Sequence, residues 1–436
     1  MLYRKIENNI KEWISTNDRT ALLISGVRQS GKTTSIRNAL NAEKCNYVEF
    51  NFVNQPEVVE LLKSNERVGA NKILALLSAF SDKPLIKNET IIFFDEVQVY
   101  KEMITIIKYM IEEGSYRYIL SGSLLGIELR DLRSAPVGYM REIQMFPLDF
   151  EEYLYAVSGI DDSFISIVRE SFEKRLPIDD NTHKKLMEYF FEYMVVGGMP
   201  KAVQAYIDSN DFNRVENIHK EIYPEYKRDF SQYEAENKKL KLIDTYDLIP
   251  AELNEINKRF TISSIDRKLK YNEATDSFEW MIHSGVSIPV YNVSQPAIPL
   301  LINRQRNLFK LFLSDVGLLT TIYGKATRLS LLNRDGRINY GAVYENFVAQ
   351  ELNTHGYKLY YFNSKKQGEI DFVIEREGNC LPIEVKSGKD YYVHSALNNV
   401  MSNADYNIKE AFVLHNGNLS MKENVVYLPI YMTMFI

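Results

Sequence analysis

At 436 residues, the chain is longer than one hydrophobic core usually supports, so we expect two to four domains. The hydrophobic fraction of 45% and the charged fraction of 25% exclude a chain that is mainly disordered or fibrous. The formal net charge of −6 excludes a basic surface over the whole molecule, so any nucleic-acid interface has to be a local patch.

Four short apolar runs separate amphipathic segments between residues 20 and 150. The runs are "TALLIS", "YVEFNF", "TIIFFDE" and "YRYILSGS", and their apolar character is typical of buried parallel strands. Strands that alternate with helical segments favour an α/β layer fold. Residues 1–150 are therefore predicted to form a domain built on a parallel sheet.

The first run leads into "ISGVRQSGKTT", which has the G-x-x-x-x-G-K-[ST] spacing of a phosphate-binding loop. Its glycines let backbone N–H groups surround a phosphate at the positive end of the following helix. Lys32 is expected to reach the outer phosphates of ATP, and the Thr33 hydroxyl to bind Mg²⁺. The predicted nucleotide-binding residues of the loop are Gly26, Gln29, Ser30, Gly31, Lys32, Thr33 and Thr34.

A second acidic feature follows the third apolar run, in "IIFFDEVQ". Asp95 and Glu96 come at the carboxyl end of a predicted strand, where open α/β sheets bind their ligands. Asp95 is expected to hold Mg²⁺ together with Thr33, and Glu96 to orient and polarise the attacking water. A strand that simply meets solvent is the alternative, which the preceding phosphate loop disfavours.

With these residues, the segment resembles an AAA-type P-loop ATPase. The resemblance makes "YRYILSGS" the next strand of the sheet, with Ser121 or Ser123 sensing the terminal phosphate. "GYMREIQMFPLDFEEYL" and the later "GGMP" are similar to a more specific family. Its members are bacterial and archaeal ATPases that join an AAA-type domain to a C-terminal domain of restriction-endonuclease-like (PD-(D/E)xK) fold.

One position departs from that family. Where the family usually has Gly-Arg, this sequence has Gly138-Tyr139, and the arginine's role would pass to Arg141, Arg133 or Arg130, or be absent. An arginine that contacts the terminal phosphate contributes about 10³–10⁵ to turnover in related enzymes. The sequence therefore predicts ATP binding, whereas rapid hydrolysis depends on whether one of these arginines takes that role.

Apolar residues in the middle of the chain recur with the period of an α-helix. Residues 151–235, with "FEEYLYAVSG" and "KKLMEYFFEYMVVGG", predict a helical lid. Residues 236–310 predict short helices followed by an extended segment, the outline of a winged helix. Basic residues in this segment would contact DNA phosphates if its second helix lay in a major groove, and otherwise are charges exposed to solvent. They are Lys258, Arg259, Arg267, Lys268 and Lys270.

Residues 311–436 are expected to form a second α/β domain, with a helix to His355 and five strands after it. Two strands flank "REGN", whose centre suits a hairpin turn. A turn there predicts that Asp371 lies directly opposite Glu384, with Lys386 on the same face. Two carboxylates so close raise one another's pKa or bind a cation, for which Mg²⁺ or Mn²⁺ is the natural choice.

A third acid is expected near this pair. Glu345 lies at the edge of the buried stripe of the helix "GAVYENFVAQELNTHG" and is placed to face a neighbouring sheet. Glu345, Asp371, Glu384 and Lys386 resemble the acid, Asp, Glu-x-Lys constellation of restriction-endonuclease-like nucleases. The resemblance makes the three acids metal ligands, and Asp371, Glu384 and Lys386 catalytic residues for phosphodiester cleavage. An exposed hairpin face with alternating charges is the alternative.

Two further features of the sequence bear on the compartment. No run of eighteen apolar residues occurs, and the first residues resemble no signal peptide, so we expect a cytoplasmic protein with no membrane contact. Cys45 and Cys380 are far apart and are expected to be reduced thiols.

The sequence thus predicts an α/β multidomain protein with ATP and Mg²⁺ as cofactors. The first hypothesis is an ATPase coupled to a metal-dependent nuclease-like domain that acts on DNA. The second is a nucleotide-switched signalling or scaffold ATPase whose C-terminal domain binds a protein partner, or a second copy of the chain, without cleaving nucleic acid.

Overall fold

The computed structural model describes residues 2–16, 18–65, 68–123, 138–233, 236–255, 258–260, 278–335 and 340–436, with side chains left aside for residues 231–238. The chain divides into two compact units. The N-terminal unit comprises residues 3–146 and 283–285, and the C-terminal unit comprises residues 1–2, 147–282 and 286–436.

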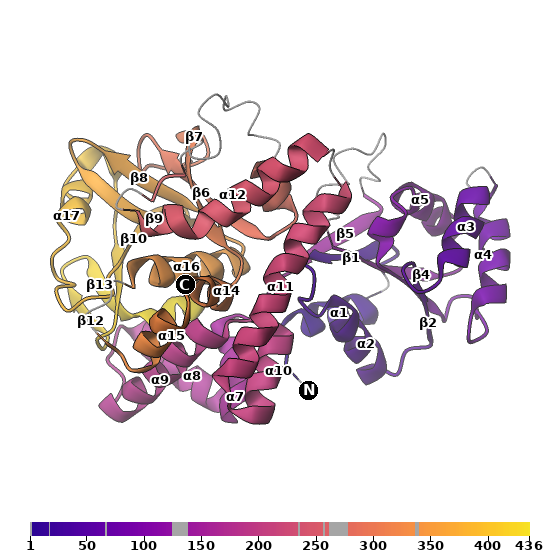
Figure 1. The fold of residues 1–436 in the computed structure, drawn as a ribbon, viewed down its shortest axis with the longest axis horizontal. Helices are drawn as coiled ribbons and strands as arrows, with labels where there is room; N and C mark the ends of the chain where they lie inside the picture. The colour runs from indigo at the N-terminus through magenta and orange to yellow at the C-terminus, as the bar shows by residue number, and fades with distance from the viewer. Residues whose placement is uncertain are drawn as a thin grey trace. The chain divides into compact units, whose positions relative to one another are not determined.

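A parallel sheet of five strands forms the centre of the N-terminal unit (Figure 1). Its order is β2-β3-β4-β1-β5, and all four predicted strands are confirmed in it. The fifth strand, β5, was not predicted as a strand; it pairs with β1 at the edge, and its residues are mostly half-buried or exposed. The strands are β1 (Ala21–Gly26), β2 (Tyr47–Asn51), β3 (Ile91–Asp95), β4 (Arg117–Ser121) and β5 (Met140–Met145).

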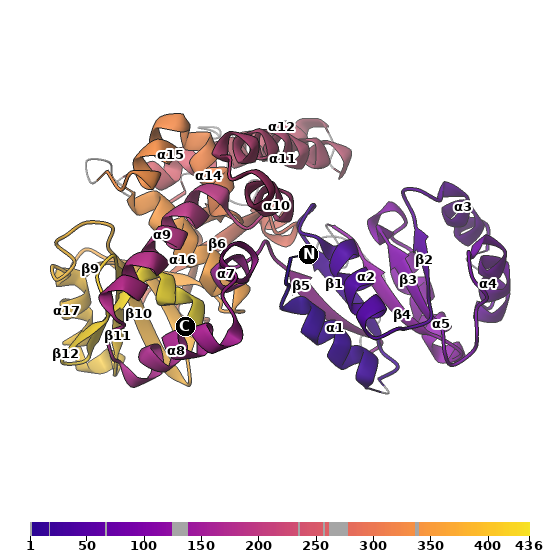
Figure 2. The ribbon, with the colours of Figure 1, turned by 90° about the horizontal axis from the view of Figure 1, so that it is seen from below.

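Helices cover both faces of this sheet (Figure 2). On one face pack α1 (Ile6–Ser15) and α2 (Lys32–Ala42). On the other face pack α3 (Pro56–Ser64), α4 (Ala70–Leu77) and α5 (Met103–Glu113). Because both faces are covered, the strands are apolar on both sides, which explains their continuous apolar runs.

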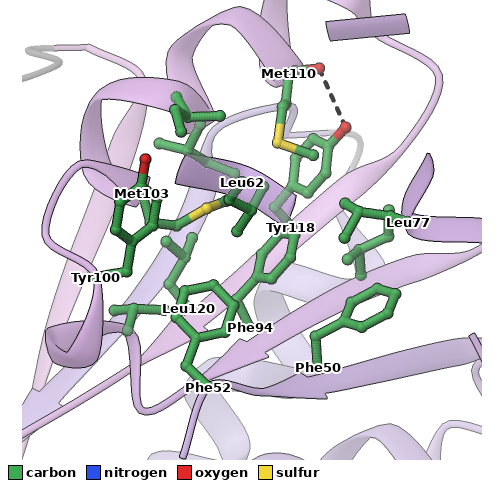
Figure 3. Close-up of a cluster of buried hydrophobic side chains, with 14 of the residues drawn as sticks. Phe50, Phe52, Leu62, Leu77, Phe94, Tyr100, Met103, Met110, Tyr118 and Leu120 are labelled. Atoms are coloured by element: carbon green, nitrogen blue, oxygen red, sulfur yellow. Dashed lines mark hydrogen bonds between the residues drawn. The ribbon is translucent and has the colours of Figure 1, made fainter. Parts of the chain in front are cut away.

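A stack of aromatic rings holds the carboxyl end of β3 in place (Figure 3). The Phe94 ring lies 5.8 Å from that of Phe50 on β2 and 6.4 Å from that of Tyr118 on β4. The Tyr118 hydroxyl donates a hydrogen bond of 3.2 Å to the carbonyl of Met110 on α5. Since Asp95 follows Phe94, this packing orients the acidic end of the strand.

The C-terminal unit begins with helices, as predicted for residues 151–235. Their caps follow from the sequence: Asp149 and Glu152 form a capping box at the start of α7. Within the described ranges, every helix is too short or too polar to cross a membrane. The helices are α7 (Phe150–Ser158), α8 (Asp162–Lys174), α9 (Asp180–Val196), α10 (Pro200–Ser209), α11 (Phe212–Tyr233), α12 (Glu236–Asn254), α14 (Val316–Tyr323) and α15 (Lys325–Leu332).

Hydrogen bonds of the "GGMP" stretch, just before α10, join it to the residues just before α7 and α14. The Gly198 N–H donates to Asp315 Oδ2 (2.6 Å), and the Gly198 carbonyl accepts from the Leu148 N–H (2.7 Å). Gly197 has φ +67°, and a Cβ there would lie 2.3 Å from Asp315 Oδ1, so only glycine fits. Burial raises the pKa of Asp315 to about 6, against the lowering effect of the backbone N–H groups around it.

A mixed sheet of eight strands completes the C-terminal unit, in the order β12-β13-β11-β10-β9-β8-β6-β7. The five strands predicted after His355 are confirmed as β8, β9, β10, β11 and β13. The strands are β6 (Ser287–Val293), β7 (Arg304–Leu313), β8 (Tyr360–Ser364), β9 (Gly368–Arg376), β10 (Asn379–Val385), β11 (Ala411–His415), β12 (Ser420–Lys422) and β13 (Val425–Pro429).

The extended segment expected to form the wing of a winged helix has a different place. β6 and β7 pair with each other, and β6 pairs with β8 in the eight-stranded sheet. The predicted boundary between residues 310 and 311 therefore falls inside β7. The physical reason is that β6 carries apolar residues on both faces, so it is buried within a sheet rather than exposed as a wing. Residues 261–277, where the second helix was expected, lie outside the described residues.

Two helices lie on this sheet. The predicted helix α16 (Gly341–Thr354) contacts β6, β7 and β10, and is buried over most of its length. The second, α17 (Ser395–Met401), contacts β9, and its Leu397 and Val400 pack into a core with Val373 and Cys380. Figure 1 shows α16 and α17 at separate positions along the sheet. The packing of α16 against β7 and β10 brings Glu345 to the strands that carry the predicted acids.

Candidate functional site

The phosphate loop has the backbone that its glycines predict. Gly26 has φ +141°, and a Cβ there would lie 2.1 Å from the carbonyl oxygen of Met145 on β5. Gln29 and Gly31 also have positive φ, 64° and 94°. These left-handed positions turn the chain sharply between β1 and α2, and a side chain at Gly26 would break the β1–β5 pairing. The loop therefore ends at the N-terminus of α2, where the dipole favours an anion.

Lys32 is buried in this loop. Its ammonium group donates to the carbonyl oxygens of Gly26 (3.0 Å) and Val27 (2.8 Å). The Ser30 hydroxyl also donates to the Val27 carbonyl, at 2.8 Å. A lysine held at the mouth of such a loop by neutral carbonyl groups can exchange them for phosphate oxygens, which attract it more strongly.

At the carboxyl end of β3, several hydrogen bonds converge on Asp95. Its carboxylate accepts hydrogen bonds from the Thr33 hydroxyl (3.0 and 3.2 Å), from Asn51 Nδ2 (2.9 Å) and from the Ser121 hydroxyl. The structure therefore brings together three residues that the sequence analysis selected from separate stretches. Oxygen atoms of a carboxylate and a hydroxyl in contact are suitable first ligands for Mg²⁺.

Asn51 is a member of this group that the sequence analysis missed. It is the last residue of β2, and its Cα is paired in register with that of Asp95 on β3. Its side-chain oxygen accepts from the N–H groups of Val53 and Asn54, which orients its amide group toward Asp95. The signal available was its place at the carboxyl end of a predicted strand, next to the acidic strand end.

Glu96 follows β3 directly and has an unusual backbone. Its φ is +58°, in the left-handed region, and its carboxylate accepts a hydrogen bond from Gln98 Nε2. A non-glycine residue in this region is uncommon and recurs at functional sites. Its catalytic role stays a prediction.

Arg4 supports the loop from outside the motif. One terminal nitrogen donates to the carbonyl of Ser30 (2.7 Å) and the other to the carbonyl of Phe146 (2.6 Å), and the residue is only 5% exposed. The guanidinium thus ties the phosphate loop to the chain just after β5. Nothing in the local sequence around Arg4 indicated this contact, since the partners are 26 and 142 residues away.

Arg141, one candidate for the arginine near the terminal phosphate, lies away from the phosphate loop of its own unit. The register pairs Arg141 with Leu22 and Met145 with Gly26, so Arg141 lies near the amino end of the parallel strands. Four residues of strand separate it from the loop end, roughly 13 Å. Arg141 forms an ion pair of 3.9 Å with Glu12, and the Tyr139 hydroxyl donates to Glu112 (2.7 Å). Arg130 and Arg133 lie outside the described residues.

In the C-terminal unit, the predicted hairpin register is confirmed. Asn379 pairs with Arg376, and the antiparallel ladder continues in step to Ile383 opposite Phe372. Extending it by one pair places Asp371 across from Glu384, as predicted. Beyond Ile383, however, the regular ladder stops.

A β-bulge accounts for the end of the ladder. On its other side β9 pairs with β8, where Tyr360 faces Val373 but Phe362 faces Ile370, so β9 has one extra residue. The extra residue falls at Asp371 and Phe372. The Asp371 carboxylate accepts a hydrogen bond from the Val385 N–H at 2.8 Å. Asp371 therefore caps the backbone of β10 and does not simply face Glu384 across the ladder.

Glu384 and Lys386 form a close pair. Their Oε1 and Nζ atoms are 2.7 Å apart, and Glu384 is buried. Burial and the charge of Asp371 raise the pKa of Glu384 to about 8, against the opposing effect of Lys386. Burial acts to lower the pKa of Lys386, but the charge of Glu384 outweighs it, so the pKa of Lys386 is raised. The second oxygen of Glu384, Oε2, is buried and accepts no hydrogen bond from the described residues.

Glu345 lies in the same electrostatic field. Burial and then the charge of Asp371 raise the pKa of Glu345, while Lys258 and Lys310 lower it. Lys258 donates to Oε1 of Glu345, and the Lys310 ammonium is 3.9 Å from Oε2. Lys310, on β7, also pairs with Glu369 at 2.7 Å. Lys310 and Glu369 are members of the cluster that the sequence analysis missed.

The three predicted acids are neighbours but not a ready-made metal site. Across the residues that the structure describes, no three His, Cys, Asp or Glu side chains are arranged to hold a metal ion. Glu345 and Glu384 are each paired with a lysine, and Asp371 with a backbone N–H. Two features still fit a divalent cation: buried carboxylate oxygens with no hydrogen bond on Glu345 and Glu384, and ligands of oxygen only.

Of the basic residues predicted to contact DNA, two are described. Lys258 pairs with Glu345. Arg259 lies near Tyr361; burial raises the pKa of Tyr361, and the charge of Arg259 partly opposes that rise. Arg267, Lys268 and Lys270 lie outside the described residues.

Comparison with known families divides the chain into three parts. Residues 18–154 match the family described as AAA domain. Residues 187–329 and 340–432 match two families described as domains of unknown function, DUF8612 and DUF4143. No curated protein matches the chain. The first part is therefore an AAA-type P-loop ATPase domain, and a nucleotide-binding role follows from it; the families do not assign a function to the other two parts.

Solved structures give distant likenesses. The Walker-type ATPase PABY2304 of Pyrococcus abyssi is 15% identical, with a TM-score of 0.44 over 74% of this chain and 96% of that one. The ORC1 protein of Aeropyrum pernix, in complex with DNA, is 11% identical, with a TM-score of 0.30 over 77% and 93%. Cdc6p of Pyrobaculum aerophilum is 12% identical, with a TM-score of 0.25 over 76% and 92%. Likenesses this distant carry no argument about function.

Proposed function

We propose that the protein hydrolyses ATP at the phosphate loop and that this cycle controls a metal-dependent, nuclease-like C-terminal domain that acts on DNA. The observation that carries the first half is the contact of Thr33 with Asp95 beside a buried Lys32. The second half is supported by the hairpin register, which brings Asp371, Glu384 and Lys386 to one strand pair beside Glu345. The resemblance to ATPases with a restriction-endonuclease-like domain points the same way.

At the phosphate loop, the roles follow from chemistry. Backbone N–H groups from Gly26 to Thr34 would surround the phosphates, and Lys32 would neutralise the outer two. Mg²⁺, when bound with ATP, would offset the negative charge of the phosphates. Thr33 and Asp95 would hold that ion, with Asn51 and Ser121 orienting the Asp95 carboxylate.

Hydrolysis assigns a role to Glu96. It would accept a hydrogen bond from the attacking water and hold it in line with the terminal phosphate. Its left-handed backbone turns it away from the strand direction that Asp95 follows. The absence of Gly-Arg at residues 138–139 predicts slow turnover unless Arg130, Arg133 or an arginine of a neighbouring chain takes that role.

In the C-terminal unit, Glu345, Asp371 and Glu384 would hold Mg²⁺ or Mn²⁺. Such an ion, when bound, would supply a nucleophilic water at neutral pH. Lys386 would offset the charge that develops on a phosphate bound there. The two buried oxygens that accept no hydrogen bond, on Glu345 and Glu384, are the observation that supports this assignment.

A second function is also supported by particular observations. Two acids of the C-terminal site, Glu345 and Glu384, are already paired with lysines, and the net charge of the chain is −6. Both favour a nucleotide-switched signalling or scaffold ATPase whose C-terminal domain binds a protein without cleaving nucleic acid. DNA retention separates the two: steep loss with added salt indicates phosphate contacts, and no retention at low salt favours the scaffold.

The decisive experiment compares cleavage of plasmid and single-stranded DNA by wild type and Asp371→Ala. Each is incubated with Mg²⁺ or Mn²⁺, with and without ATP. We expect metal-dependent cleavage by wild type that is lost in Asp371→Ala and kept in Asp208→Ala, a change of an exposed aspartate on α10. Uncut DNA under all conditions with wild type would reject the nuclease proposal and leave the ATPase proposal standing.

A further inference from the structure

Lys258 reaches the C-terminal acid cluster from outside the sheet. It belongs to the short described segment of residues 258–260, which follows α12. The Phe260 N–H donates to the Phe309 carbonyl on β7 (2.9 Å), and its ring packs 5.3 Å from Phe278 and 6.0 Å from Phe309. These contacts hold the segment against the sheet, so that the Lys258 ammonium binds Oε1 of Glu345.

Glu345 therefore has two lysine neighbours of different kinds. The Lys310 side chain is 1% exposed, is fixed on β7 and also binds Glu369 at 2.7 Å. The Lys258 side chain is 21% exposed and pairs only with Glu345 among the described residues. An ammonium group with access to water recovers its hydration when it leaves its partner, whereas a fully buried one does not. Another cation can thus replace Lys258 at Glu345, whereas Lys310 stays bound.

The remaining oxygens define what could replace Lys258. Oε2 of Glu345 and Oε2 of Glu384 are buried and accept no hydrogen bond in the described part of the chain, and both residues are more than nine-tenths buried. Four carboxylates in the cluster, from Glu345, Glu369, Asp371 and Glu384, face three ammonium groups, from Lys258, Lys310 and Lys386. The cluster therefore has more carboxylates than ammonium groups, and its buried carboxylate oxygens that accept no hydrogen bond are ligands of the kind that a divalent cation binds.

We propose that Lys258 is an internal counterion of Glu345 that a divalent cation has to displace. The inference rests on the cation site of the proposed function and adds a competitor to it. Lys258 and the cation need the same carboxylate, and two positive charges at one oxygen repel. Binding of the cation then frees Lys258 and loosens the tie between residue 258 and α16. The Lys258–Glu345 ion pair therefore raises the cation concentration that binding requires.

The test measures Mn²⁺ binding to the full chain without nucleotide, from the electron paramagnetic resonance signal of free Mn²⁺ at pH 8. All variants carry Asp95→Asn, so that the phosphate-loop carboxylate does not contribute. Lys258→Met keeps the aliphatic stem and removes the charge. We expect it to bind Mn²⁺ about tenfold more tightly, the lower end of what a hydrogen bond to a charged group is worth.

The matched control is Lys227→Met. Lys227 is on α11, its side chain is 26% exposed, and it pairs with Asp247 at 2.6 Å, so it is a lysine of similar exposure in an ion pair elsewhere in the unit. It should leave the Mn²⁺ affinity unchanged. Thermal unfolding of each variant checks that it folds, and Lys258→Gln should tighten Mn²⁺ binding in the same direction.

Two results would overturn the inference in different ways. Equal Mn²⁺ affinity of Lys258→Met and its parent, with binding abolished by Glu345→Gln, rejects the competition but keeps the cation site. No Mn²⁺ binding to either protein rejects the cation site of the proposed function and the inference with it. In a background of Glu345→Gln, Lys258→Met should not restore Mn²⁺ binding, because the carboxylate for which the lysine and the cation compete has gone.

Discussion

The two sites of this protein balance their charges in different ways. At the phosphate loop, Asp95 is surrounded by neutral donors from Thr33, Asn51 and Ser121, and Lys32 by backbone carbonyls. In the C-terminal unit, by contrast, Glu345 and Glu384 are paired with lysines. A ligand at the phosphate loop replaces neutral partners, whereas one at the C-terminal cluster competes with charges.

This difference predicts how each site responds to substitutions. Neutral partners cost little to displace, so nucleotide binding depends chiefly on the residues that touch the phosphates. Ion pairs inside a unit are stronger and are mutually dependent, so removing one lysine changes the acids beside it. We therefore expect large, residue-specific effects at the phosphate loop, and effects that depend on pH and on the cation at the C-terminal cluster.

The largest effect is expected from Glu96→Gln. Removing the proposed base should lower ATP turnover about 10²–10⁴-fold, because that is the usual contribution of a positioned general base. ATP affinity should change little, since Gln keeps the size and the contact with Gln98. Phosphate release and binding of labelled ATP measure the two quantities. Glu102→Gln, just before α5, is the control, and unchanged turnover in Glu96→Gln would remove Glu96 from the mechanism.

Lys32→Met should have the next largest effect, on binding. Loss of a charged hydrogen bond to phosphate, worth about 1.5–3 kcal/mol, corresponds to roughly 10–100-fold weaker ATP binding. Fluorescent ATP titration measures it, with the exposed Lys63→Met on α3 as the control. If Lys32→Met bound ATP as wild type does, the phosphate loop would not be the nucleotide site, and the contrast between the two sites would fail.

Arg4→Ala tests a contact that acts through the loop and not on the ligand. It should weaken ATP binding by up to about tenfold, because the lost hydrogen bonds position Ser30 and only part of their strength bears on the nucleotide. KM should rise while kcat stays close to that of wild type, and Arg4→Lys should restore part of the affinity. A fall in thermal stability with unchanged KM would mean that Arg4 is only structural.

The last prediction concerns the pH dependence of stability at the C-terminal cluster. The pKa of Glu384 is raised to about 8 in the folded protein from an ordinary 4.5, so between these values the folded state holds a proton that the unfolded state has lost. Stability then falls as pH rises through this window. Glu384→Gln should flatten the fall in melting temperature between pH 5 and 8, measured in EDTA. The exposed Glu170→Gln should keep the wild-type slope, and an equal slope in Glu384→Gln would contradict the raised pKa.

Local interactions explain which parts of the molecule could be predicted. The phosphate loop lies in eleven consecutive residues, "ISGVRQSGKTT", and its neighbours in sequence are its neighbours in space. The hairpin around Gly378 is equally local, so its turn sets the register from Asn379 to Ile383. The buried strands β1 to β4 were recognisable because both faces of a covered parallel sheet are apolar.

Only the tertiary structure decided what those local elements meet. The pairing of β9 with β8 creates the bulge that turns Asp371 toward the Val385 N–H, which the hairpin alone does not reveal. β6 and β7 join the eight-stranded sheet, and with them come Lys310 and the segment of Lys258. Such contacts can join residues 142 positions apart, as at Arg4, and depend on how whole surfaces pack. Periodicity reports which face of an element is buried but does not identify the element that buries it.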